Sequence, residues 1–359
     1  MKNISPEIIE KAKVWLSEKY DSNTRKQVQE LIDNNPSELL ESFYKNLEFG
    51  TGGLRGIMGV GSNRMNTYTV AMATQGFANY IKKMFSSIEQ PKIAIAYDCR
   101  NNSKEFAQTA AEVMSANGIK VYIFNSLRPT PELSFAIREL KCQAGIVITA
   151  SHNPKEYNGY KVYWEDGAQL PPAHASTVSE TAAKLDIFED VKRISFEEGV
   201  KKGLIKIIGK ETDERFLSEI MKCRISPEAT KKYGNSLNMI YTPVHGTGTK
   251  LVPSLLEQCG ITNLKVVETQ RIPDGNFPTV ASPNPENPEC FNEAKKLDAE
   301  TGGVCELIVA TDPDADRTGV TIKSAEGEYN LFTLFNPRML IAIDATPLVR
   351  KLSFPIILT

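Results

Sequence analysis

A short apolar run from Gly145 to Ala150 ends in a loop that contains a hydroxyl, an imidazole and an amine. The loop begins with Ser151 and His152, and Lys161 follows after a polar stretch. In α/β enzymes, catalytic side chains are commonly held on loops that follow strands. A serine hydroxyl that exchanges a group needs partners that take up and return a proton, and His152 and Lys161 are the candidates. We therefore predict a reactive site at this loop.

Three carboxylates, Asp312, Asp314 and Asp316, alternate directly after a second apolar run. Alternation along extended backbone would place them on one face, with the intervening proline keeping the backbone open. Converging carboxylates repel one another unless a cation offsets their charge, and hard oxygen ligands favour Mg²⁺. A calcium-binding EF-hand is excluded, because Arg317 and Lys323 occupy the positions that require Gly and Glu. The sequence thus predicts a magnesium site.

Three more loops carry groups that could contact an anion. The glycine-dense loop Gly50–Gly56 contains Arg55, and glycine-rich backbone can approach anions closely, although glycine clusters also form plain turns. Asp98 and Arg100 follow a predicted strand and could simply brace their own loop. His245 follows another strand, and a place near the site and a structural role are equally open.

Alternating helices and strands must position these loops. Helices are predicted at residues 5–19, 23–33, 36–45, 70–85, 103–117, 131–140, 249–259 and 290–301. Strands are predicted at residues 92–97, 120–124, 145–150, 237–241, 264–268 and 307–310. This order predicts an α/β fold of two consecutive domains with mainly parallel mixed sheets, preceded by a helical segment.

A change in composition near residues 200–210 suggests a first domain over 1–205 and a second over 206–330. Residues 331–359 form a tail whose apolar residues are interrupted by prolines, which suits neither a long helix nor a regular strand. A frameshift or premature stop is the simplest interpretation of this tail, and a specialised short homologue is the alternative.

The composition excludes several functions. The chain has 359 residues and a net charge of −2, which gives no general attraction to nucleic acid or to acidic membranes. The N-terminus has no apolar core of signal-peptide length, and no stretch reaches the length of a membrane span. Six scattered cysteines without Cys-x-x-Cys spacing fit a reducing cytoplasm, so we expect a cytoplasmic protein. No sequence feature indicates an oligomeric state.

The motifs resemble those of the α-D-phosphohexomutases, the phosphoglucomutase/phosphomannomutase family. The resemblance rests on Thr149-Ala-Ser-His-Asn-Pro154 with Asn158-Gly-Tyr-Lys161, on Asp312-Pro-Asp-Ala-Asp-Arg-Thr-Gly319, and on the glycine-dense loop, all in the family order. It implies an isomerase of carbohydrate metabolism that converts a sugar 1-phosphate to a 6-phosphate through a bisphosphate intermediate.

The same resemblance implies roles for the candidate residues. Ser151 would carry the phosphoryl group, after priming by an activator of the glucose 1,6-bisphosphate type. One Mg²⁺ would be bound by the three aspartates and an oxygen of phosphorylated Ser151. The remaining roles are proton transfer by Lys161, orientation of phosphoryl or substrate oxygens by His152, and contact with phosphate or substrate by Arg317 and Arg55.

Two alternatives stay open beside the mutase. A metal-dependent phosphatase would use Asp312 as its nucleophile, and a catalytically inactive fragment would keep only the phosphate-and-Mg²⁺ site. The family's sugar-selecting loop lies in a third domain and has no counterpart in this sequence, which leaves glucose, mannose and pentose phosphates as candidate substrates. With its third and fourth domains absent, we expect the chain to bind Mg²⁺ but to turn over poorly.

Overall fold

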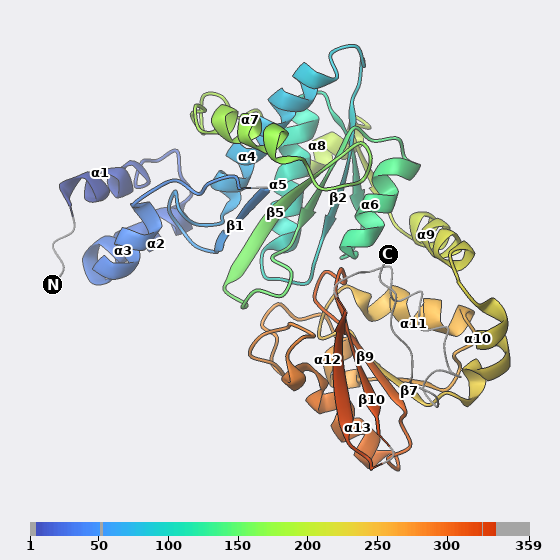
Figure 1. Cartoon of the computed structure of the whole chain (residues 1–359). Coiled ribbons are helices and arrows are strands. Elements are labelled where there is room, and N and C mark those ends of the chain that lie inside the picture. The colour runs from blue at the N-terminus through green and yellow to red at the C-terminus, as the bar shows by residue number, and fades with distance from the viewer. Residues whose placement is uncertain (1–4, 51–52, 325, 335–359) are drawn as a thin grey trace.

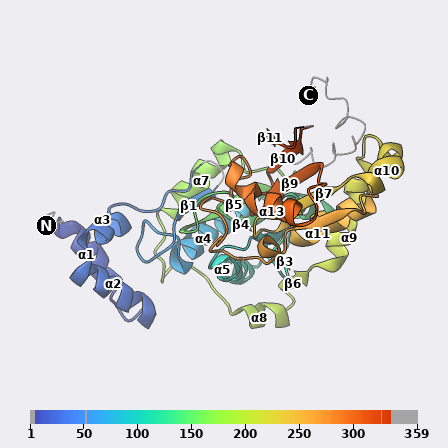
Figure 2. The same cartoon turned by 90° about the horizontal axis from the view of Figure 1, so that it is seen from below.

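The computed structural model of the protein describes residues 5–50, 53–324 and 326–334. Figure 1 shows two α/β units, one above the other, and an N-terminal group of helices at one side of the first unit. Figure 2 shows the same group projecting from the rest of the molecule in a second view. The predicted fold class is confirmed: an N-terminal helical segment is followed by two α/β units with mixed sheets.

The N-terminal segment consists of α1 (Pro6–Val14), α2 (Ser22–Asn34) and α3 (Pro36–Phe43). Asp21 caps α2 by accepting hydrogen bonds from two backbone N–H groups, and proline stands at the first position of α1 and α3. The apolar sides of these helices meet around Trp15 and Phe43, which pack against Tyr68 of the first unit. The segment is therefore attached to the first unit through an aromatic cluster.

The first unit is built on a six-stranded sheet with the order β1-β5-β4-β2-β3-β6. Its strands are β1 (Gly53–Ile57), β2 (Lys92–Tyr97), β3 (Lys120–Phe124), β4 (Ala144–Ile148), β5 (Tyr157–Trp164) and β6 (Ile205–Ile208). The four strands from β4 to β6 in this order are parallel, whereas β5 runs antiparallel to both β4 and β1. The antiparallel strand returns the chain after the serine loop directly beside β4.

Helices cover both faces of this sheet. They are α4 (Thr67–Met84), α5 (Ser103–Ala116), α6 (Thr130–Glu139), α7 (Pro172–Ala182) and α8 (Phe196–Lys201). In β2, Ile93 and Ile95 belong to the core beneath α4 and α5, whereas the alternate residues Ala94 and Ala96 pack toward α6. A strand that is buried on both faces reads as a continuous apolar run, which explains why β2 was predicted with correct ends.

The second unit has a five-stranded sheet with the order β11-β10-β9-β7-β8. Its strands are β7 (Met239–Thr242), β8 (Leu264–Val266), β9 (Leu307–Thr311), β10 (Thr318–Lys323) and β11 (Tyr329–Leu334). Its helices are α9 (Lys210–Lys222), α10 (Pro227–Tyr233), α11 (Gly248–Gln258), α12 (Glu268–Arg271) and α13 (Asn292–Glu300), with short 3₁₀ turns at Gly234–Ser236 and Pro288–Phe291. Here β9, β7 and β8 are parallel, and β10 and β11 are antiparallel additions.

The division of the chain at residue 205 remains a prediction, and β6, which begins there, pairs with β3 of the first sheet. Of the predicted tail, residues 331–334 lie within β11, and 335–359 lie outside the described residues.

An ion cluster, in which Arg128 and Asp213 are buried and Lys250 is exposed, joins the two units. Arg128, which precedes α6, donates to both carboxylate oxygens of Asp213 on α9, at 2.7 and 3.0 Å. Lys250 on α11 contacts the same carboxylate at 2.7 Å. This cluster fixes the second unit against the first at the side of the sheet where the serine loop lies.

Candidate active site

The serine loop follows β4 and turns sharply at Ser151. This residue has a φ of 54°, in the left-handed region that few non-glycine residues adopt, and it is only 3% exposed. Its backbone N–H donates to the hydroxyl of Thr149 at 2.8 Å, and its Oγ lies 3.2 Å from Nδ1 of His152. Residues in such sparsely populated backbone conformations are concentrated at functional sites.

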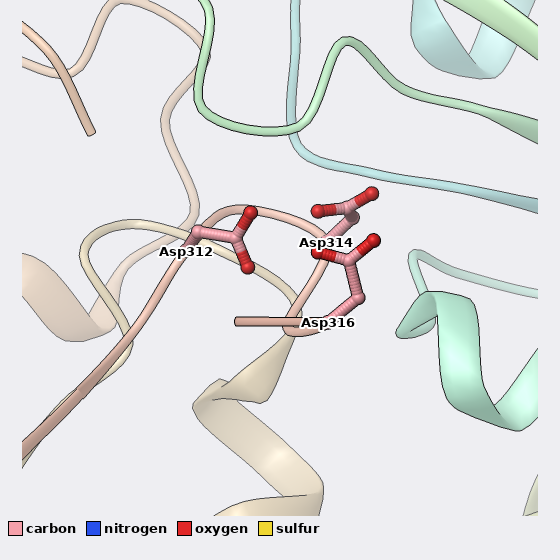
Figure 3. Close-up of side chains that lie close together, drawn as sticks. All are labelled: Asp312, Asp314 and Asp316. Atoms are coloured by element: carbon pink, nitrogen blue, oxygen red, sulfur yellow. The ribbon is translucent and has the colours of Figure 1, made fainter. Parts of the chain in front are cut away.

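The acidic loop connects β9 to β10 in the second unit. The sequence predicted that strand alternation would align the three carboxylates, and this was wrong: the residues form a turn, with Ala315 at a φ of 52°. The turn brings oxygens of Asp312, Asp314 and Asp316 to within 4.8 Å of one another, and Figure 3 shows the three carboxylates gathered over it. Asp312 and Asp314 are fully buried.

The two loops meet across the units. Ser151 Oγ donates to Oδ2 of Asp312 at 2.9 Å. Lys161, on β5, donates to Oδ2 of Asp314 at 3.0 Å and lies 3.6 Å from a carboxylate oxygen of Asp316. The hydroxyl, the amine and the three carboxylates that the sequence singled out therefore form one cluster.

Burial and mutual repulsion make it unfavourable for all three carboxylates to be ionised at the same time. Burial, reinforced by Asp314 and Asp316, raises the pKa of Asp312 well above its usual range. Burial and the charge of Asp314 likewise raise the pKa of Asp316 to about 6. Burial opposes the charged form of Asp314 too, but Lys161 outweighs it and holds the pKa of Asp314 well below its usual value. For Lys161 itself, the two carboxylates overcome the burial that would lower its pKa, and raise it.

These groups fit a hard divalent cation. Asp314 Oδ1 and Asp316 Oδ1 are buried and have no hydrogen-bond partner among the residues that the structure describes. Buried carboxylate oxygens without partners are costly, and a cation would satisfy them and relieve the repulsion. The donor atoms are all oxygens, which is the set that Mg²⁺ prefers.

Two arginines contact residues close to Ser151. Arg55, on β1, donates to the side chain of Asn153 in the serine loop at 3.4 Å. Arg317 donates its backbone N–H to Oδ1 of Asp312 at 3.1 Å and its guanidinium to Glu286 at 3.3 Å. Burial, followed by the charges of Arg317 and Arg55, lowers the pKa of His152. Both arginines thus bring positive charge close to His152, the neighbour of Ser151. This charge would stabilise an anion bound there.

Several supporting residues were not assigned to the site from the sequence. Thr130, at the start of α6, donates its hydroxyl to Asp314 at 3.1 Å. Gly246 and Thr247 pack beneath Pro313, whose carbonyl accepts from Thr247 N–H at 2.8 Å.

His245 is buried, and its ring nitrogens lie near Ile272 O and Thr279 Oγ1, at 3.1 and 2.9 Å. These contacts anchor the loop after α12.

Fold and site together define an α/β protein in which a strand-end serine of one domain faces a cluster of three carboxylates of the next. Among the described residues, no helix has the length and apolar character needed to cross a membrane. Residues 46–187 match the family model for α/β/α domain I of phosphoglucomutase/phosphomannomutase, and residues 214–326 match that for domain II. The chain belongs to the phosphoglucomutase/phosphomannomutase family.

Individual relatives agree with this assignment. The chain is 38% identical over 308 residues to a phosphoglucomutase of Staphylococcus epidermidis, an alignment that covers 84% of this chain and 53% of the relative. It is 36% identical over 323 residues to a phosphoglucomutase of Staphylococcus aureus, covering 89% and 55%. The chain therefore spans about half the length of the curated relatives it matches.

Solved structures show the same fold. A putative phosphomannomutase from Thermus thermophilus has a TM-score of 0.63 at 22% identity, covering 79% of this chain and 58% of that one. A family protein from Burkholderia thailandensis has a TM-score of 0.60 at 21% identity, covering 80% and 56%.

Proposed function

We propose that this chain carries the phosphoryl-donor half of a phosphohexomutase, with Ser151 as the residue that gives and receives the phosphoryl group. The observation that supports this most directly is the 2.9 Å contact between Ser151 Oγ of the first unit and Asp312 of the second. The contact joins a buried hydroxyl on left-handed backbone to a cluster of carboxylate oxygens of the kind that Mg²⁺ prefers, and the charges of Arg55 and Arg317 act on the adjacent His152. Sugar 1-phosphates and 6-phosphates are the proposed substrates, interconverted through a bisphosphate intermediate.

Transfer requires charge neutralisation and proton movement. Phosphoserine carries about −1.5 to −2 charges, which Arg55 and Arg317 are placed to offset, Arg317 with a planar fork of donors. Lys161 holds a proton near the site and is the group that we propose exchanges it with the reacting oxygens. His152, held close to Ser151 Oγ, is proposed to orient the phosphoryl group.

One Mg²⁺ is proposed at Asp312, Asp314, Asp316 and an oxygen of phosphorylated Ser151. When bound, it supplies positive charge that offsets the phosphoryl oxygens during transfer. An activator of the glucose 1,6-bisphosphate type is proposed to prime the serine.

The contacts of Asp312 favour the mutase over the alternative of a metal-dependent phosphatase that uses Asp312 as its nucleophile. One carboxylate oxygen accepts from Ser151 Oγ and the other from the backbone of Arg317. Each oxygen of Asp312 already accepts from a donor of the protein, which weakens it as a nucleophile, whereas an oxygen that accepts one hydrogen bond still has a lone pair for a cation.

Because the chain spans about half of its relatives, we propose that this polypeptide alone is a weak mutase. Positioning of a reacting group can supply about 7–11 kcal/mol of a barrier, and we propose that part of this contribution is lost when the polypeptide acts alone. A coupled assay with glucose 1-phosphate tests this, and robust turnover by the purified chain would refute it.

Phosphate mapping tests the donor. The purified chain is incubated with glucose 1,6-bisphosphate and Mg²⁺, and the modified residue is located by mass spectrometry. We expect phosphate on Ser151 and none in the Ser151→Ala variant. Phosphate on Asp312 would establish the phosphatase instead, and a chain that takes up no phosphate would be only a binding fragment.

A further inference from the structure

The guanidinium of Arg100 lies buried beneath the serine loop and donates to four of its backbone carbonyls. Arg100 is 3% exposed. One terminal nitrogen donates to the carbonyl of Ser151 at 2.7 Å and to that of Asn153. The other donates to the carbonyls of Pro154 and Tyr157, at 2.8 and 3.0 Å. A single side chain therefore fixes the backbone of the loop from the reactive serine to the start of β5.

Arg100 is itself held rigidly at the end of β2. Asp98 is buried, and one of its carboxylate oxygens lies 3.4 Å from Nε of Arg100. The other accepts from Arg100 N–H at 2.9 Å and from Ser103 Oγ at 2.7 Å. The guanidinium thus has one orientation, with its terminal nitrogens directed at the loop.

The second unit completes this arrangement. The ring of Phe277 lies 5.1 Å from Cζ of Arg100, a cation–π contact between buried groups. Phe277 has a φ of 48°, an uncommon backbone conformation for a bulky residue. Gly275 allows the close approach, because a Cβ there would lie 2.4 Å from Asn101 N. The loop of the second unit is therefore seated on Arg100.

Ser151 needs such support, because its own backbone lies in the left-handed region. Conformations of this kind persist only where the surroundings determine them. We propose that Arg100 is the positioning residue of the phosphoryl donor: by holding the Ser151 carbonyl, it keeps Oγ directed at Asp312, and Phe277 couples this position to the docked second unit. This inference rests on the proposed function, since it assigns Arg100 to the transfer that Ser151 performs.

The test substitutes Arg100→Lys, which keeps the positive charge but cannot reach four carbonyls with a planar fork. Arg64→Lys is the matched control: Arg64 is 5% exposed and donates to the carbonyls of Glu41 and Asn63, but does not contact the serine loop. The reaction is single-turnover transfer from glucose 1,6-bisphosphate. The Ser151 Oγ–P bond forms, the sugar O–P bond breaks, and the sugar oxygen gains the proton that the serine loses.

We expect Arg100→Lys to slow phosphorylation of Ser151 at least 100-fold while the bisphosphate concentration for half-maximal rate changes little. Amide hydrogen exchange within residues 151–157 should accelerate at least tenfold. Arg64→Lys should change neither quantity. A folded Arg100→Lys chain that is phosphorylated at the wild-type rate overturns the proposal.

A second variant covers the case in which Arg100→Lys does not fold. Phe277→Leu keeps an apolar side chain but removes the ring, and we expect a phosphorylation rate about tenfold below the wild type, with faster exchange in residues 151–157. Unchanged rate and exchange in this variant contradict the coupling. If the wild type itself takes up no phosphate, the proposed function fails, and exchange in Arg100→Lys still decides whether Arg100 holds the loop.

Discussion

Thr130 of the first unit holds Asp314 of the second unit through two hydrogen bonds. Its backbone N–H donates to the Asp314 carbonyl at 2.9 Å, and its hydroxyl donates to the carboxylate at 3.1 Å. The hydroxyl contact fixes the carboxylate orientation from outside the acidic loop. Groups of this kind around a metal ligand commonly change metal affinity 10–100-fold when they are lost.

The Thr130→Val variant tests this contact. It keeps the shape of the side chain and the backbone hydrogen bond but removes the hydroxyl. We expect Mg²⁺ affinity, measured by titration calorimetry, to fall about tenfold. Thr130→Ser retains the hydroxyl and should bind nearly as the wild type does. Equal affinities for all three chains would show that Thr130 does not orient the ligand.

Mg²⁺ should reverse the effect of Asp312→Asn on stability. Without metal, this substitution removes a buried carboxylate from a repulsive cluster, so the free energy of unfolding should be unchanged or higher. With Mg²⁺ at 100 times its dissociation constant, the wild type should gain about 2.7 kcal/mol and the variant far less. Denaturant unfolding in EDTA and in Mg²⁺ measures both quantities. Asp33→Asn, at an exposed position of α2, is the control and should respond as the wild type does.

Glu132 should make stability depend on pH. It is fully buried, and burial, with repulsion from Asp213, raises its pKa from 4.5 to about 9. Between these values the folded chain binds a proton that the unfolded chain has released, so the free energy of unfolding falls as pH rises. The slope is about 1.4 kcal/mol per pH unit for one proton.

The Glu132→Gln variant should lose this slope between pH 6 and pH 8, as measured by urea unfolding at several pH values. Glu139→Gln is a control on the same helix, because Glu139 forms a partly exposed pair with Arg215. A wild type whose stability is flat over this range would show that Glu132 is already ionised when folded.

Gly246→Ala should disturb the acidic loop from beneath. An added Cβ would lie 2.5 Å from Cα of Pro313, and backbone cannot move aside as a side chain can. We expect about 1–3 kcal/mol of destabilisation and Mg²⁺ affinity at least tenfold weaker. In Gly199→Ala the new Cβ would meet the side chains of Ile205, 2.4 Å from its Cδ1, and of Ser115, which lie outside the acidic loop, so Mg²⁺ binding should stay unchanged. Calorimetric titration of both variants distinguishes crowding at the loop from crowding in general.

Three strands that are buried on both faces were predicted closely from the sequence. Strands at 92–97 and 120–124 agree with β2 and β3, and 307–310 differs from β9 by one residue. In these strands apolar content and strand formation coincide, so the pattern alone is sufficient.

The strand β5 was missed for the opposite reason. Asn158, Gly159 and Lys161 make its first half polar and were read as part of the serine loop, although the strand continues through Trp164. Asn158 is fully buried, and its amide is satisfied there because it donates to Asn101 O and to Ser103 Oγ. Where polar side chains form or support a site, they interrupt the apolar pattern on which strand prediction depends.

The sequence indicated which residues come together in the site, but not the backbone conformation that brings them together. Convergence of the three aspartates was expected from strand alternation and arises from a turn at Ala315. The contact of Thr130 with Asp314 joins residues that are 184 positions apart, and no local pattern marks such a pair. The supports of a site depend on tertiary packing, whereas its reactive groups are visible in the motifs.

Because β5 pairs with an antiparallel strand on each side, the number of residues between Ser151 and Lys161 matters for the site. Lys161 pairs with Val147 of β4 on one side and with Gly53 of β1 on the other. A shift of one residue would turn every side chain of the strand to the opposite face and present Tyr160 or Val162 to the carboxylates. Although residues 154–156 are exposed, a one-residue change in this connection that shifted β5 would therefore place an apolar side chain, instead of the Lys161 amine, beside Asp314 and Asp316.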